Sequence, residues 1–149
     1  MNAGQLLRQA GERATPVRVQ VLRCLIRRGH PISQSQLARL PELAGCDRVT
    51  LYRTLNRLRQ VGLVHAVEGI DGAWRYCAHR SEARGCPGDH PHFLCLACGV
   101  MTCLTGQKLP HVDVPPGVQV QGKQLVVYGR CAACLQPKTG GEELPQGRP

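Results

Sequence analysis

The stretch HPHFLCLACGVMTCL, residues 90–104, concentrates side chains that bind metals. It contains His90, His92, Cys95, Cys98 and Cys103. Imidazole and thiolate groups are ligands that Zn²⁺ favours, but closely spaced cysteines also occur in redox centres. The stretch alone therefore leaves open one metal site, two metal sites or a redox centre.

Two Cys-x-x-Cys pairs predict one tetrahedral zinc site. Cys95 and Cys98 form the first pair, and Cys131 and Cys134 form the second. Each pair can hold an ion from a tight turn, and together they supply four thiolates. A thioredoxin-like redox motif or unrelated thiols are weaker interpretations, because two such pairs occur on expected turns or strand ends. We therefore expect structural Zn²⁺ whose binding contributes about 10–16 kcal/mol in peptide models.

The remaining His and Cys residues predict a second, looser metal site. His90 and His92 are separated by one residue, so on an extended segment both side chains point to one face. Each histidine alone is better explained as an ordinary solvated side chain, but the whole set favours Zn²⁺ over metals that prefer oxygen ligands. The candidate ligands are His65, Cys77, His79, Cys86, His90, His92 and Cys103. Such a site would bridge the two halves of the chain and could report on metal level.

Composition limits the class of protein. The chain has 149 residues, a net charge of +9 and only 3% aromatic residues. This charge points to an anionic partner, with nucleic acid ahead of an anionic membrane surface. No apolar run approaches the roughly 20 residues of a membrane span, and the N-terminus lacks a secretory signal. We therefore expect a cytoplasmic protein with no membrane association, in which metal ligation is a better explanation of the nine cysteines than structural disulfides.

The arginine-rich N-terminal half predicts three helices. Thr15 and Pro16 begin a helix that Gly29 ends, and Ser33 with Gln36 forms a capping box for a short helix through Leu40. Asp47 caps a third helix that Gly62 closes. We expect an apolar stripe on this third helix, formed by Val49 (or Tyr52), Leu55, Leu58 and Val61.

A β-hairpin is predicted directly after the third helix. The alternating segments LVHAVE and AWRYCAH are joined by GIDG, in which Asp-Gly is a strong turn signal. Three helices and a two-stranded wing form a winged helix-turn-helix, whose last helix enters the DNA major groove. The arginines alone are equally consistent with a solvated helix face, and the wing favours DNA binding.

The C-terminal half predicts mainly strands. The segment FLCLACGVMTCL predicts a hairpin that turns at Cys98-Gly99, and GVQVQGKQLVVYGR predicts a strand with a possible bend at Gly122. We expect a winged-helix domain over residues 1–79, a hinge loop over 80–90, a metal-binding domain over 91–136, and a disordered tail over 137–149.

Three motifs resemble the ferric uptake regulator (Fur) family of bacterial metal-dependent repressors: DRVTLYRTLNRLRQVGLVH, HPHFLCLACG and LVVYGRCAAC. The resemblance covers about residues 5–135. It implies an α+β fold, with a winged helix-turn-helix DNA-binding domain followed by a small α/β dimerisation domain with a zinc site of four cysteines. Members of this family are homodimers that bind AT-rich operators when metal is bound.

Within the family, GLVHAVEGIDGAWRYC is most similar to the zinc uptake regulator (Zur) branch. The resemblance implies a regulatory site at His65, Cys77, His90 or His92, and Cys103, with Cys86 and His79 as alternates. Cys103 stands where the family usually has Glu. A thiolate there favours Zn²⁺ over Fe²⁺ or Mn²⁺, and argues against a peroxide sensor with oxygen-rich iron ligation.

The resemblance also implies DNA contacts from the third helix. Tyr52 would contact bases or thymine methyl groups, and Arg48 and Arg53 would contact bases or phosphates. Thr50 and Arg57 would position the helix on the DNA backbone.

The run TGQKLPHVDVPPG departs from the family, which has an amphipathic helix at this place. Pro110, Pro115 and Pro116 argue against a helix, so we expect a dimer interface that is smaller or depends more on strand pairing. A third metal site found in many members is also not expected, because its usual positions hold Asp89, Pro91, Pro110 and Lys123, although His111 is a partial substitute.

Together these features predict a zinc-responsive transcriptional repressor, not an enzyme, that binds double-stranded operator DNA as a homodimer. Each chain would hold one structural and one regulatory Zn²⁺. The alternatives are an iron- or manganese-responsive repressor of the same family, and a redox switch in which Cys77, Cys86 or Cys103 oxidises. A zinc hydrolase needs a general base beside an open metal position. It is disfavoured, because no Glu is adjacent to the His90–His92 pair and the nearest candidate base is Glu82.

Overall fold

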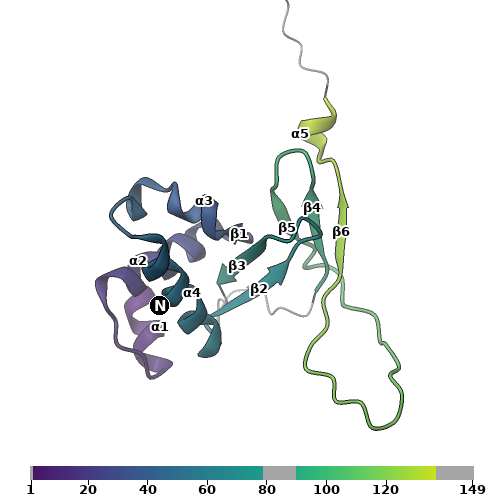
Figure 1. Ribbon diagram of the computed structural model, residues 1–149, viewed down its shortest axis with the longest axis horizontal. Helices are drawn as coiled ribbons and strands as arrows, with labels where there is room; N and C mark the ends of the chain where they lie inside the picture. The colour runs from purple at the N-terminus through teal and green to yellow at the C-terminus, as the bar shows by residue number, and fades with distance from the viewer. Residues whose placement is uncertain (1, 79–89, 137–149) are drawn as a thin grey trace, which may run out of the picture.

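The computed structural model describes residues 2–78 and 90–136 and has the expected α+β composition (Figure 1). The N-terminal part contains α1 (Ala3–Gln9), α2 (Pro16–Arg28), β1 (Ile32–Ser33), α3 (Gln34–Ala38), the 3₁₀ helix η1 (Pro41–Leu43), α4 (Arg48–Gln60), β2 (Val64–Glu68) and β3 (Trp74–Ala78). The C-terminal part contains β4 (His92–Cys95), β5 (Met101–Cys103), β6 (Val126–Gly129) and α5 (Ala132–Leu135).

The predicted helix caps are present. The Thr15 side chain accepts a hydrogen bond from the Arg18 N–H at the start of α2, and Gly29 ends that helix in the left-handed conformation. Ser33 and Gln36 form the predicted capping box, but α3 ends at Ala38 rather than Leu40. The Asp47 carboxylate accepts from two N–H groups in the first turn of α4, and hydrogen bonds from the Thr50 side chain and from these N–H groups lower its pKa. The local sequence therefore predicted the starts of these helices correctly but misplaced the end of α3.

The buried face of α4 differs from the predicted stripe. Leu51, Thr54, Leu55 and Leu58 are buried, whereas Val49 and Tyr52 are more than half exposed. The prediction was wrong about Val49 and about its alternative Tyr52, and it omitted Leu51. The sequence could not distinguish the two faces near the start of this helix, because apolar residues lie on both. The exposed face consequently carries Tyr52 and the neighbouring arginines.

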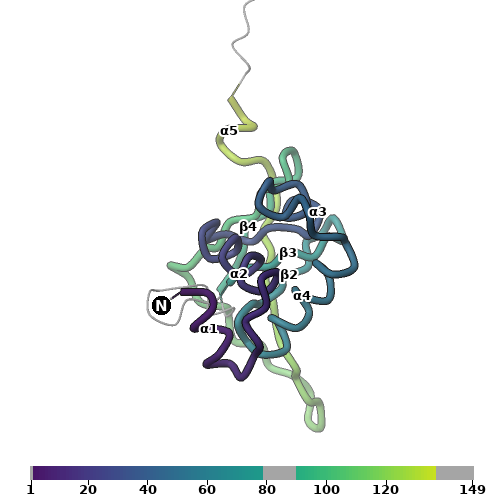
Figure 2. Tube along the Cα trace, turned by 90° about the vertical axis from the view of Figure 1, so that its left-hand side faces the viewer, coloured from purple at the N-terminus to yellow at the C-terminus, as the bar shows by residue number. Residues whose placement is uncertain are grey.

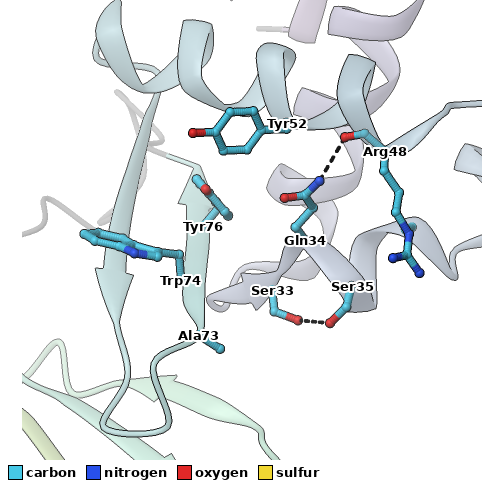
Figure 3. Close-up of a pocket in the computed structure, with 9 residues that line it drawn as sticks. Ser33, Gln34, Ser35, Arg48, Tyr52, Ala73, Trp74 and Tyr76 are labelled. Carbon is cyan, nitrogen blue, oxygen red and sulfur yellow. Dashed lines mark hydrogen bonds between the residues drawn. The ribbon is translucent and has the colours of Figure 1, made fainter.

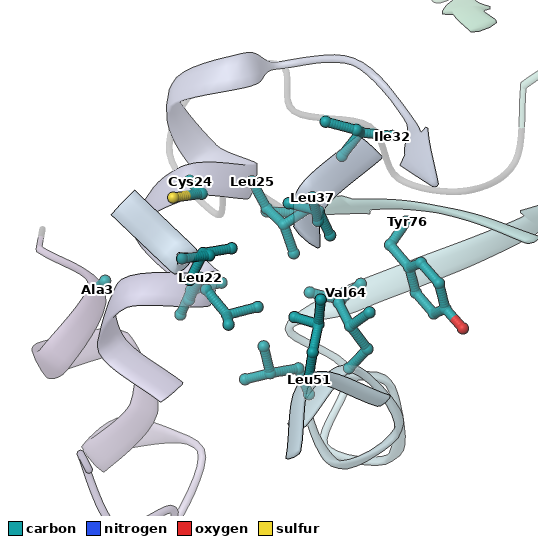
Figure 4. Packing of buried hydrophobic residues seen from close by; sticks show 14 of the residues in the cluster. Ala3, Leu22, Cys24, Leu25, Ile32, Leu37, Leu51, Val64 and Tyr76 are labelled. Carbon is teal, nitrogen blue, oxygen red and sulfur yellow. The ribbon is translucent and has the colours of Figure 1, made fainter. Parts of the chain in front are cut away.

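The wing strands β2 and β3 have two different buried faces. They pair antiparallel, and the short β1 joins the other edge of β3, which sequence reasoning did not anticipate. Val64, Tyr76 and Ala78 belong to the main core with the leucines of α1, α2 and α4 (Figure 4). Figure 1 shows α1–α4 gathered on one side of the wing, whereas α5 lies beyond the end of β6, and Figure 2 looks onto the side of α1–α4.

The second sheet has the order β5-β4-β6. β4 and β5 form the predicted antiparallel hairpin, with Gly99 at φ 73° in its turn, and β6 lies parallel to β4. The strand predicted over residues 117–130 is wrong in its first part, because regular pairing is confined to Val126–Gly129. Residues 104–125 contain no helix, as their prolines indicated.

Several predictions fall on residues outside the described part. The tail, residues 137–149, lies there entirely, and so does the hinge loop except His90, so the domain boundaries stay predictions. Among the described residues, no helix is both long and apolar enough to cross a membrane.

Candidate metal centres

The four paired cysteines converge at one end of the second sheet. Cys95 ends β4, and Cys98 follows in the hairpin turn. Cys131 is the N-cap of the short helix α5, and Cys134 lies within that helix. Their four Sγ atoms all lie within 4.8 Å of one another, and the Cys98 and Cys131 sulfurs are 3.9 Å apart. Ligand sulfurs around a tetrahedral Zn²⁺ are separated by about 3.8 Å, so this donor set fits that ion with small adjustments.

Close packing of the four thiols separates their pKa values. The Cys131 N–H donates to the Cys95 Sγ at 3.3 Å, and this bond lowers the pKa of Cys95 to about 6. The neighbouring Cys131 thiol raises the pKa of Cys134 to about 12. One thiolate thus suppresses ionisation of the next, whereas a divalent cation would favour all four thiolates and release their protons.

Strand periodicity places the second set of candidate ligands between the two sheets. His65 and Cys77 are directly opposite each other in β2 and β3, so their side chains share one face of the wing. Val67 is on that same face and packs against Leu94 and Met101 of the second sheet. The wing therefore presents His65 and Cys77 on its face away from the helical core.

The second sheet brings three further candidate ligands to this interface. His92 and Cys103 are opposite each other in β4 and β5, and His90 precedes β4. The ligand atoms of these three residues lie within 4.8 Å of one another, and both histidines are buried. The His65 ring centroid is 5.9 Å from that of His92 and 6.4 Å from that of His90. The group within 4.8 Å does not include His65 or Cys77, which approach it from the wing.

This donor set suits a metal ion that is intermediate between hard and soft. Two imidazoles and a thiolate are characteristic zinc ligands, and the neighbouring His65 and Cys77 offer a fourth of either type. His65, His90 and His92 also line an open cavity of about 330 Å³, which gives an ion a path from solvent. Arg59 and Lys123 line the same cavity. The alternates His79 and Cys86 lie outside the described residues.

A second cavity of about 380 Å³ lies between α4 and the wing (Figure 3). Arg48 and Tyr52 line it from α4, and Trp74 and Tyr76 line it from β3. The chain has one Trp, three Tyr and one Phe, and three of these five surround this cavity. Sequence reasoning missed Trp74 and Tyr76, although their scarcity and the nearby arginines were a usable signal for nucleic-acid contact.

The predicted DNA-contact residues have different surroundings. Arg48, Tyr52 and Arg53 are exposed, and Thr50 is half-buried. Arg57 is exposed as well, but it also makes an ion pair, since its Nε donates to the buried Glu12 carboxylate at 2.8 Å. Arg18 contacts the same carboxylate at 2.9 Å, and the Arg57 hydrogen bond is the main cause of the lowered Glu12 pKa. Arg57 therefore connects α4 to the segment between α1 and α2.

Comparison with known proteins gives consistent matches. The model of the ferric uptake regulator family matches residues 9–113. The peroxide-responsive repressor PerR of Staphylococcus aureus is 26% identical over 134 residues, covering 86% of each chain. A solved zinc uptake regulator, complexed with zinc and DNA, is 25% identical, with a TM-score of 0.59 and 89% of each chain covered.

Two further solved structures support the fold alone. The Vibrio cholerae ferric uptake regulator is 22% identical, with a TM-score of 0.61 over 86% of this chain and 98% of the other. A zinc-bound manganese uptake regulator is 20% identical, with a TM-score of 0.62 over 88% of this chain and 99% of the other.

Proposed function

The chain belongs to the ferric uptake regulator family, and from this premise we propose that it is a zinc-responsive repressor that binds operator DNA as a metal-loaded homodimer. Membership makes it a metal-responsive transcription regulator. The finer proposal concerns the metal, the ligands and the assembly.

The observation that carries the zinc proposal is the meeting of His90, His92 and Cys103 beside His65 and Cys77. A thiolate and imidazoles favour Zn²⁺, whereas Fe²⁺ and Mn²⁺ sites are usually richer in oxygen ligands. No carboxylate belongs to this group among the described residues. The likeness to a zinc uptake regulator complexed with zinc and DNA supports the same assignment.

The proposed regulatory site would act through the contact between the two sheets. Zn²⁺ bound there would link the wing to the second sheet and so favour one arrangement of the two. The four paired cysteines would hold a second, structural Zn²⁺. With the wing fixed, α4 can present Tyr52 to the bases, Arg48 and Arg53 to bases or phosphates, and Thr50 to the DNA backbone.

The assembly and location are part of the proposal. β6 is an edge strand with Val127 and Tyr128 about half exposed, which suits pairing with a second copy. A regulator of operators would work in the cytoplasm, and this account requires no catalysis.

Metal analysis and DNA binding together test the proposal. Protein purified without added metal should contain two zinc ions per chain, one of which a mild chelator removes. Affinity for an operator selected from random DNA should fall on that removal and return with Zn²⁺. Operator binding that is unchanged by the loss of one metal would refute the regulatory role.

A redox-switched regulator is the second candidate, because two thiols, Cys77 and Cys103, face this interface and a curated relative is peroxide-responsive. Cys77→Ser and Cys103→Ser variants distinguish the two. A redox sensor would lose its peroxide response and keep metal-dependent DNA binding, whereas a zinc sensor would lose metal activation. Metal titration of the operator complex separates zinc from iron or manganese as effector.

A further inference from the structure

A buried arginine joins the wing to the hairpin turn of the four-cysteine cluster. Arg75 in β3 is only 3% exposed, yet it carries a positive charge. Its guanidinium donates to both carboxylate oxygens of Asp71, at 2.9 and 2.7 Å. Asp71 lies in the turn between β2 and β3, so this two-point contact fixes the end of the wing to its own strand.

The same guanidinium also reaches the second sheet. Its Nε and Nη2 donate to the Gly99 carbonyl at 3.3 and 3.2 Å. Gly99 directly follows Cys98, and its own N–H donates to the Cys95 carbonyl at 2.8 Å. A single planar group therefore connects the wing turn to the turn that positions two of the four cysteines.

The surroundings leave this guanidinium little freedom to find other partners. A Cβ on Gly69 would lie 2.6 Å from an Arg75 nitrogen and 3.0 Å from Leu94, so the site accepts only glycine without displacement. Val67, directly opposite Arg75 in the strand pair, is buried in one cluster with Leu94 and Met101. An arginine buried in this way stays charged and needs its partners, because an unpaired buried charge is costly.

We propose that Arg75 is a positioning residue through which the state of the four-cysteine site controls the wing. When Cys95 and Cys98 are held by metal, their turn presents the Gly99 carbonyl to Arg75, and Arg75 in turn holds Asp71. When the site is empty, that turn loosens and the wing loses one of its anchors. The four-cysteine site would thus influence the DNA-binding half directly. The coupling rests on the structural Zn²⁺ of the proposed function, and its consequence for DNA rests also on the proposed repressor role.

Hydrogen exchange of the wing amides tests this coupling without DNA. Full-length wild type would be compared with a Cys98→Ser/Cys134→Ser variant whose loss of metal is verified by elemental analysis. We expect amides of residues 66–76 to exchange at least about fivefold faster in that variant, while amides of α2 and α4 stay protected. Unchanged wing exchange after loss of the metal would overturn the proposal.

An arginine variant shows whether Arg75 carries the coupling. Arg75→Met/Asp71→Asn removes both charges, so neither is left unpaired and the fold is retained. In this background, wing exchange should be fast already and should not respond to loss of the four-cysteine site. Arg27→Met is the matched control, because Arg27 pairs with Glu42 on the helical side. A full response in the Arg75→Met/Asp71→Asn background would assign the coupling to other contacts. If operator affinity did not depend on metal while wing exchange behaved as expected, only the proposed metal-dependent repressor role would fail.

Discussion

Cys103 faces His92 across the β4–β5 hairpin, and its thiol sets the chemical character of the proposed regulatory site. A carboxylate at this position would add an oxygen donor that Mn²⁺ and Fe²⁺ accept more readily. The proposed metal preference of this chain thus depends on one side chain.

We predict that Cys103→Glu lowers Zn²⁺ affinity at this site by at least about tenfold and lowers Mn²⁺ affinity less or raises it. Competition titration against a chromophoric chelator measures both values. Cys46→Ser is the control, because Cys46 lies in the connector before α4 and belongs to neither cysteine group. Equal losses for both metals would contradict the role given to the thiol.

Asp71 gives a pH-dependent prediction. The hydrogen bonds from Arg75 lower the pKa of Asp71 from 3.8 to about 2, so the ion pair stabilises the fold above about pH 4 and is lost as the pH falls towards 2. Asp71→Asn should cost on the order of 1 kcal/mol at pH 6, since partial exposure of the carboxylate weakens the pair. Urea unfolding of both proteins should converge near pH 2, and a constant difference down to pH 2 would be inconsistent with this pair.

At the scale of elements, the turn between β2 and β3 depends on a glycine for its packing. Gly69→Ala should destabilise the protein by about 1–3 kcal/mol, because the added methyl group meets Asp71, Arg75 and Leu94. Gly45→Ala, where no atom lies within 4 Å of the added carbon, should be near neutral. Urea unfolding compares the two variants, and equal stabilities would show that the wing turn adapts freely.

Two arginines of helix α4, Arg53 and Arg57, have different expected roles, one in DNA binding and one in fold stability. Arg53 and Arg57 are both exposed, but Arg57 also pairs with the buried Glu12. We predict that Arg53→Ala lowers the slope of log affinity for operator DNA against log salt by about one unit, the loss of one phosphate contact. Arg57→Ala should leave that slope nearly unchanged and should lower the thermal unfolding midpoint instead. The opposite pattern would place Arg57 on the DNA.

At the scale of the whole molecule, the wing is shared by two cores. One face packs on the helices and the other on the second sheet, so the proposed regulatory site lies where two independently packed parts meet. The small second cluster, which includes Val67, Leu94 and Met101, is too limited to fix that arrangement strongly by burial alone. A metal or an ion pair at this interface can therefore change the arrangement.

The proposed dimer gives a prediction at the same scale. Tyr128→Glu places a charge on the exposed edge strand β6 and should convert the homodimer to a monomer. Val112→Glu introduces the same charge in the irregular segment before β6 and is the control. Analytical ultracentrifugation measures both, and a dimer retained by Tyr128→Glu would place the interface elsewhere.

Local patterns in the sequence were sufficient for much of the fold. Caps at Thr15, Ser33 and Asp47 fixed the helix starts, and Asp-Gly after β2 indicated the wing hairpin. These signals depend on neighbouring residues only, so they can be read without the fold. The shortened β6 and the added β1 depend on partners far away in the chain and could not be read in this way.

The sequence by itself determined which residue types are available: two Cys-x-x-Cys pairs, and a dispersed group of histidines and cysteines. Tertiary structure alone decided that His92 and Cys103 are opposite in one sheet while His65 and Cys77 are opposite in another. It also decided that Arg57 contacts Glu12 and that Arg75 connects Asp71 to Gly99. The physical reason is that spacing along the chain limits local geometry, whereas contacts between distant strands depend on how the two cores pack.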